Sequence, residues 1–61
     1  MLTARQQQIL QRLAEGASIK EIAFELGVSI KTVETHMSAV LRKLQLSNRR
    51  ELARWARDRG I

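Results

Sequence analysis

The sequence predicts an all-α fold in which four short helices pack around one compact core. Proline is absent, glycine occurs only three times in 61 residues, and apolar residues recur three or four positions apart rather than two. Residues suited to capping a helix N-terminus then mark four helix starts. Together these observations predict helices over residues 4–15, 19–26, 30–44 and 49–59 of one domain spanning residues 1–61.

The first two helices are predicted to start after Thr3 and Ser18. Gln6 and Glu21 stand three residues beyond these caps, where their side chains can bond back to the amide of the cap residue. Each helix carries an apolar stripe at helical spacing, and both stripes are expected to face one shared core. The stripe residues are Ile9, Leu10 and Leu13 on the first helix and Ile19, Ile22, Ala23 and Leu26 on the second.

A tight turn is predicted between the second and third helices. Gly27 can adopt the left-handed conformation that ends a helix, Val28 packs inward, and Ser29 caps the next helix with its hydroxyl. The tripeptide Ser-Ile-Lys occurs at 18–20 and again at 29–31, and we interpret both copies as a cap, an inward residue and a solvated residue. Helices joined in this way cross steeply, which makes the fold a compact four-helix domain containing a helix-turn-helix.

The third helix is predicted to carry two chemically different faces. Its core stripe comprises Val33, Met37, Val40, Leu41 and Leu44. The opposite face can hydrogen-bond throughout, and comprises Lys31, Glu34, Thr35, Ser38 and Arg42. A flanking row holds Thr32, His36, Ala39 and Lys43. After a tight turn, such a face suits the major groove of double-stranded DNA, although most polar helix faces are simply solvated.

Individual residues on this helix suggest specific contacts with DNA. Glu34 can accept a hydrogen bond from a cytosine amino group, and Thr35 and Ser38 can bond several base edges. The flanking row suits phosphate oxygens of the DNA backbone. His36 borders the core stripe beside Val40, so a packing or backbone-bonding role competes with a phosphate contact. No second metal ligand or nucleophile accompanies the histidine at useful spacing.

The fourth helix is predicted to start after Asn48, with Glu51 completing the cap, and to bury Leu52, Trp55 and Ala56. The net charge of +5 is concentrated here, because residues 42–61 hold seven basic and two acidic residues. Residues 1–41 hold four of each sign. A polyanion is the natural partner for such an end, although cations also favour helix C-termini and solvated faces.

Several functional classes are excluded or disfavoured by composition. Without cysteine there is no disulfide or thiolate metal site, and without a glycine-rich phosphate loop, paired carboxylates or a second histidine an enzyme is not expected. We expect no cofactor and no catalytic or metal-binding residues. The apolar runs are too short to span a bilayer and no leader begins the chain, so the protein is expected to be cytoplasmic. Phe24 lies beside the stripe of the second helix, where a protein contact is one interpretation.

Taken together, these segments resemble the LuxR-type, or GerE-like, helix-turn-helix of bacterial transcription regulators. The resemblance covers nearly the whole chain. It rests on LTARQQQIL at 2–10, EGASIKEIAFELGVSIKTVETH at 15–36 and RKLQLSNRRELARWA at 42–56, and on the spacing between them.

The resemblance implies sequence-specific DNA binding for transcription regulation, with the third helix in the major groove and the fourth commonly forming a dimer contact. It implies a domain that is usually the output end of a two-component response regulator or a quorum-sensing receptor, where an N-terminal regulatory domain precedes it, although some such domains are free-standing. By position, Glu34, Thr35 and Ser38 correspond to base-facing residues. The residues corresponding to DNA-backbone contacts are Lys31, Thr32, His36 and Lys43, to which the polar face adds Arg42. Lys or Arg is frequent in the family at positions 34 and 38, and a charged residue at position 24.

The assembly expected from the sequence is a homodimer on DNA that is monomeric as an isolated domain. Arg50, Arg54 and Arg57 share the outward face of the fourth helix, where a symmetric contact would bring like charges together. RNA polymerase is a further potential partner. Two other functions remain open at this point: the promoter-recognition region of a sigma factor, which carries a similar helix-turn-helix, and a helical protein-interaction module without affinity for DNA.

Overall fold

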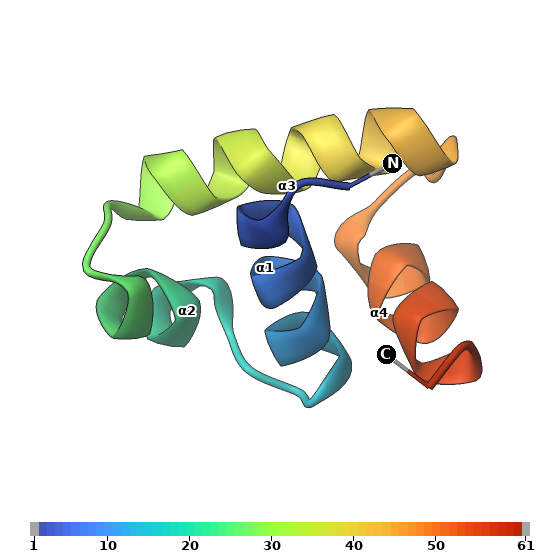
Figure 1. The fold of residues 1–61 in the computed structure, drawn as a ribbon, viewed down its shortest axis with the longest axis horizontal. Coiled ribbons are helices and arrows are strands. Elements are labelled where there is room, and N and C mark those ends of the chain that lie inside the picture. The colour runs from blue at the N-terminus through green and yellow to red at the C-terminus, as the bar shows by residue number, and fades with distance from the viewer. Residues whose placement is uncertain (1, 61) are drawn as a thin grey trace.

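The computed structural model describes residues 2–60, so the two ends of the expected 1–61 domain lie outside the described residues. The described residues form four helices and no strand, which confirms the all-α, four-helix prediction (Figure 1). The helices are α1 (Ala4–Ala14), α2 (Ile19–Leu26), α3 (Ile30–Leu44) and α4 (Arg49–Asp58). The first and last helices each end one residue earlier than predicted.

Helix α1 is the centre of the fold and packs against each of the other three helices. Helix α3, the longest, lies along one side of the molecule, and α1 starts close to it and runs away from it (Figure 1). Helices α2 and α4 lie on either side of α1, and both also contact α3. One long face of α3 is therefore left without any covering helix.

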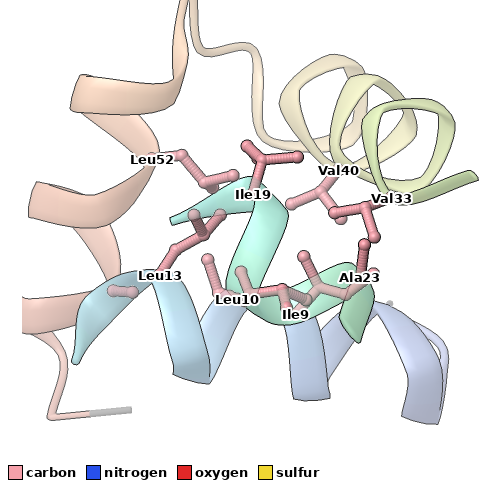
Figure 2. Close-up of a cluster of buried hydrophobic side chains, with 10 residues drawn as sticks. Ile9, Leu10, Leu13, Ile19, Ala23, Val33, Val40 and Leu52 are labelled. Atoms are coloured by element: carbon pink, nitrogen blue, oxygen red, sulfur yellow. The ribbon is translucent and has the colours of Figure 1, made fainter. Parts of the chain in front are cut away.

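The core lies where the apolar stripes of the four helices meet (Figure 2). Its buried residues are Ile9, Leu10, Leu13, Ile19, Ile22, Ala23, Val33, Val40, Leu52 and Ala56. The remaining predicted stripe residues pack against this core with part of their surface exposed, namely Leu26, Met37, Leu41, Leu44 and Trp55. Trp55 is thus a packing residue as predicted, and the guanidinium carbon of Arg59 lies 4.2 Å from the centroid of its ring.

Side-chain caps start all four helices, as the sequence predicts. The reciprocal pairs of Thr3 with Gln6 and Ser18 with Glu21 are both formed, with the cap hydroxyl oxygen accepting from an amide at 3.1 Å. The reciprocal prediction for Glu51 is wrong. Its carboxylate accepts from the amide of Ser47 at 2.7 Å instead of from Asn48, while the Asn48 side chain still accepts from the Glu51 amide at 2.9 Å.

The two Ser-Ile-Lys copies have the same capping geometry but different burial. Ile19 is buried at 8% exposure, whereas Ile30 is 46% exposed. The interpretation of an inward residue in both copies is therefore wrong for Ile30. Capping is local and depends on the serine, but burial depends on what lies beside each first helical turn.

Within residues 2–60, every helix falls short of the length and apolar character that crossing a bilayer requires.

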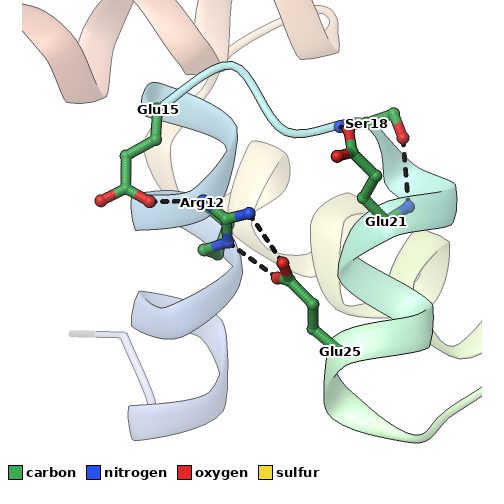
Figure 3. Close-up of polar contacts among 5 residues, drawn as sticks. All are labelled: Arg12, Glu15, Ser18, Glu21 and Glu25. Carbon is green, nitrogen blue, oxygen red and sulfur yellow. Dashed lines mark hydrogen bonds and ion pairs between the residues drawn. The ribbon is translucent and has the colours of Figure 1, made fainter.

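A charged cluster fastens α1 to α2 on the surface (Figure 3). Arg12 donates from Nε and Nη2 to the two carboxylate oxygens of Glu25, both at 2.8 Å, and from Nη1 to Glu15 at 2.5 Å. The hydrogen bonds from Arg12 lower the pKa of Glu25 despite some loss of solvation. Because these side chains are solvent-accessible, the cluster orients the two helices more than it stabilises them.

Helix α3 ends at a residue that no glycine pattern indicates. Gln45 adopts the left-handed conformation, with φ 57° and ψ 41°, and is the only non-glycine residue with positive φ among the described residues. The amide of Leu46 then donates to the carbonyl of Leu41 at 2.9 Å and closes the helix end. A residue with a Cβ pays about 1–2 kcal/mol for this conformation.

Replacing Gln45 with glycine is therefore expected to raise the free energy of unfolding. Relief of the left-handed strain outweighs the greater unfolded-state entropy of glycine, which leaves a net gain of about 0.5–1 kcal/mol. Urea unfolding followed by circular dichroism measures this difference. The matched control is Gln8→Gly, at an exposed position inside α1, which is expected to lower the free energy of unfolding by about 0.5–1 kcal/mol. Loss of stability in both variants would contradict a strained helix end.

Candidate nucleic-acid interface

The turn between α2 and α3 sets the position of the candidate site. Gly27 takes the left-handed conformation at φ 68° and ψ 32°, and the Val28 amide donates to the carbonyl of Ala23 at 3.0 Å. Val28 packs against the core, and the Ser29 hydroxyl accepts from the amide of Thr32 at 3.0 Å. The predicted turn is thus present, and three residues separate two packed helices. This arrangement is a helix-turn-helix.

The uncovered face of α3 carries the polar residues that the sequence analysis places there. All of them are exposed, namely Lys31, Glu34, Thr35, Ser38 and Arg42. The residues lie opposite Val33 and Val40, which are buried at 0% and 1% exposure, so their orientation is fixed by the core. A cylinder of about 10–12 Å diameter with such a face fits the major groove of B-form DNA, which is about 12 Å wide.

Two threonine hydroxyls on α3 already have hydrogen-bond partners in the helix or at its N-cap. Thr35 Oγ1 donates to the carbonyl of Lys31 at 3.0 Å, and the Thr32 and Ser29 hydroxyl oxygens lie 2.9 Å apart. Because the Thr35 hydroxyl hydrogen is used in this way, its oxygen is left as an acceptor and its methyl group as an apolar contact. Glu34 is likewise an acceptor when ionised. Two of the three base-facing candidates therefore favour base edges that donate hydrogen bonds.

Lys43 is placed differently from the other basic residues of α3. Its side chain is exposed along the flank, yet its ammonium nitrogen lies 3.1 Å from Oε1 of Gln6 on α1. The same oxygen accepts from the amide of Thr3 at 3.0 Å, and Gln6 is buried at 6% exposure. Lys43 thus joins the end of α3 to the start of α1. The pairing links residues 37 positions apart, and sequence reasoning missed it because local periodicity carries no information about it.

The flanking residues His36 and Ala39 are half-buried, whereas Thr32 is exposed. His36 makes no side-chain hydrogen bond in the part of the chain that the structure describes, so its position agrees with packing at the edge of the core stripe. Residues 2–60 bring together no group of three or more His, Cys, Asp or Glu side chains that could hold a metal ion. Phe24 is 88% exposed on α2, and it points away from the core.

Comparison with known proteins gives a consistent result. Residues 1–56 match the family described as bacterial regulatory proteins, luxR family. The chain is 51% identical over 53 residues to the transcriptional regulatory protein UhpA of Escherichia coli, covering 87% of this chain and 27% of that protein. It is 47% identical over 55 residues to the transcriptional regulatory protein LiaR of Bacillus subtilis, covering 90% and 26%. With DesR of Bacillus subtilis it shares 37% over 59 residues, covering 97% and 30%. The chain therefore spans about a quarter of the length of these relatives.

Proposed function

Since the chain belongs to the luxR family of bacterial regulatory proteins and has the DNA-binding role of that family in transcription regulation, we propose that the exposed face of α3 reads the major groove. The observation that carries this proposal is the row of exposed polar side chains on α3, directly after the tight turn at 27–29. Family membership favours a transcription regulator over a sigma-factor region or a protein-interaction module. No catalytic role is proposed.

The proposed contacts divide into two groups. Glu34, Thr35 and Ser38 lie at the middle of the exposed face and are proposed to contact base edges. The proposed DNA-backbone contacts surround them, and are Lys31, Thr32, His36, Arg42 and Lys43. Phosphate contacts fix the position of the protein on the duplex, and base contacts supply sequence preference.

The chain is proposed to act as the output part of a longer cytoplasmic regulator. Its relatives are about four times as long, which leaves room for an N-terminal regulatory domain of response-regulator or quorum-sensing type. Such a domain would control when α3 reaches DNA, and RNA polymerase is the proposed downstream partner.

Changing Lys43 to alanine tests the proposed phosphate contacts. Each phosphate neutralised by a basic residue contributes about −0.9 to the slope of log affinity against log salt concentration. The variant is therefore expected to bind specific and random duplexes more weakly by similar factors, with a salt slope shallower by about 0.9. Fluorescence anisotropy on the two duplexes at several salt concentrations measures both quantities.

Gln6→Ala provides the control, because it removes the partner of Lys43 on α1 and leaves the ammonium group in place. If Lys43 contacts phosphate, the Gln6 variant keeps the full salt slope. If the Lys43 variant keeps the salt slope of the unchanged chain, or if both variants lose the same amount of slope, Lys43 does not contact phosphate. Its role would then be to join α3 to α1 through Gln6.

Assembly on DNA is proposed to be dimeric, with a monomeric domain in free solution. Leu52 and Ala56 of α4 are fully buried in the core, whereas Arg50, Arg54 and Arg57 are exposed. A symmetric contact through these arginines is unfavourable until DNA phosphates supply counter-charge. Sedimentation equilibrium should give a monomer, and titration of a duplex with two half-sites about 34–36 Å apart should give two chains bound. A tight dimer without DNA, or one chain per duplex, would contradict the paired-site arrangement.

A further inference from the structure

Ile30 is a large apolar residue that α3 leaves in contact with solvent. It is the first residue of the helix and is 46% exposed. The other large apolar residues of α3 are buried or pack against the core, namely Val33, Met37, Val40, Leu41 and Leu44. Figure 1 shows the first turn of α3 beyond α1 and α4, beside the turn from α2. The helix therefore starts with one exposed, branched apolar side chain.

Ile30 lies in the same row of side chains as two of the candidate base contacts. Residues four apart on an α-helix lie one above the other, so Ile30, Glu34 and Ser38 form one row, which Arg42 extends. All four side chains are exposed. A single exposed apolar residue is ordinary on a protein surface, and what distinguishes Ile30 is its place at the start of this row. In helix-turn-helix proteins the N-terminal residues of the second helix contact base edges.

The chemistry of Ile30 selects one group in the major groove. Its side chain neither donates nor accepts a hydrogen bond, so covering an amino group, a carbonyl oxygen or a ring nitrogen of a base would cost that group its water. The C5-methyl group of thymine is the apolar group that the bases present in this groove. Contact between two apolar groups removes both from water, and burial of one methyl group favours binding about fourfold.

We propose that Ile30 contacts the methyl group of a thymine and is a specificity-determining residue of the DNA site. This inference rests on the proposed function, in which α3 reads the major groove. Ile30 and Glu34 are four residues apart, about 6 Å along the helix axis, and successive base pairs are about 3.4 Å apart. The thymine is therefore expected about one or two base pairs from the cytosine that Glu34 contacts, on the side of the α3 N-terminus.

The test replaces each thymine of a duplex selected from a random pool, one at a time, with deoxyuridine, which lacks only the C5-methyl group. Fluorescence anisotropy titrations with the 61-residue chain measure the affinity for each duplex. At one thymine near the cytosine contacted by Glu34, the replacement is expected to weaken binding about fourfold. A selected site without a thymine within about two base pairs of this cytosine would overturn the proposal.

Ile30→Ala assigns this methyl group to its protein partner. The shorter side chain no longer reaches the methyl group, so the variant is expected to bind the thymine duplex about fourfold more weakly and to lose no further affinity with deoxyuridine. Phe24→Ala is the matched control, because it removes a larger exposed apolar side chain from α2, outside the row. The control is expected to keep the fourfold difference between the two duplexes.

The same difference between thymine and deoxyuridine in Ile30→Ala as in the unchanged chain would show that another residue senses the methyl group, and the proposal would be wrong. Equal weakening of Ile30→Ala on every duplex would show contact with the sugar-phosphate backbone, with the same consequence. The Glu34 variants test the proposed function separately. If they change base preference while Ile30 does not sense the methyl group, only the thymine contact is wrong. If neither residue affects base preference, α3 does not read the groove and both proposals fail.

Discussion

Replacing Leu52 with alanine is expected to lower the free energy of unfolding by about 2–5 kcal/mol. Leu52 is 0% exposed and is one of two α4 residues buried in the core, where α4 packs mainly against α1. A domain of 61 residues has a total stability of only about 3–9 kcal/mol at the usual value per residue. The melting temperature of the variant is therefore expected to fall by about 10 °C or more. Part of the population is then expected to be unfolded at 37 °C.

Phe24→Ala is the matched control for this prediction. It removes a larger apolar side chain, but Phe24 is 88% exposed and its loss leaves no cavity. The free energy of unfolding is expected to change by about 0.5 kcal/mol or less. Thermal and urea unfolding of both variants, followed by circular dichroism, measure the contrast. Similar stabilities for the two variants would mean that α4 is not anchored through Leu52.

Periodicity and capping predicted most of the fold because both depend on residues close in sequence. Val33 and Val40 are seven apart on one helical face, and both are buried as that spacing requires. The turn at Gly27 followed from the conformational freedom of glycine and the capping hydroxyl of Ser29. The same reasoning predicted which face of α3 is exposed, since the opposite face is fixed by the core.

The features that sequence reasoning missed depend on tertiary position. Ile19 and Ile30 occur in identical tripeptides, yet only Ile19 meets the core, because the first turn of α3 has no equivalent covering helix. The contact of Lys43 with Gln6 joins two helices that are distant in sequence. Gln45 takes a left-handed conformation, although the sequence has no glycine there to indicate a helix end. At the candidate site, the pattern predicted exposure but not the bond that commits the Thr35 hydroxyl hydrogen.

The chemistry of the exposed face of α3 predicts a preference for particular base edges. Glu34 and Thr35 are adjacent and exposed, and both are left as hydrogen-bond acceptors, because the Thr35 hydroxyl donates to the Lys31 carbonyl. In the major groove only cytosine and adenine present amino donors. Guanine presents acceptors alone, which a carboxylate repels. A base pair that offers a cytosine amino group to Glu34 is therefore expected in the selected DNA site.

Glu34→Ala is expected to relax this preference at one position of the site by about 1–3 kcal/mol, or about fivefold to 150-fold in relative affinity. Overall affinity is expected to rise, because a negative charge near the phosphates is lost. Asp58→Ala removes an equal charge from α4 and serves as the control, so it can raise affinity but is expected to leave base preference unchanged. Selection of bound sequences from a random duplex pool, repeated with each variant, measures the preference.

A third variant, Glu34→Gln, tests the direction of the effect rather than its size. A glutamine amide both donates and accepts, and it pairs best with the N6 and N7 edge of adenine. The preferred base at the position read by residue 34 is therefore expected to change from cytosine to adenine, with the rest of the site conserved. An unchanged consensus in both Glu34 variants would mean that the carboxylate is merely solvated. A change at several positions at once would mean that it orients α3 in the groove instead of contacting a single base pair.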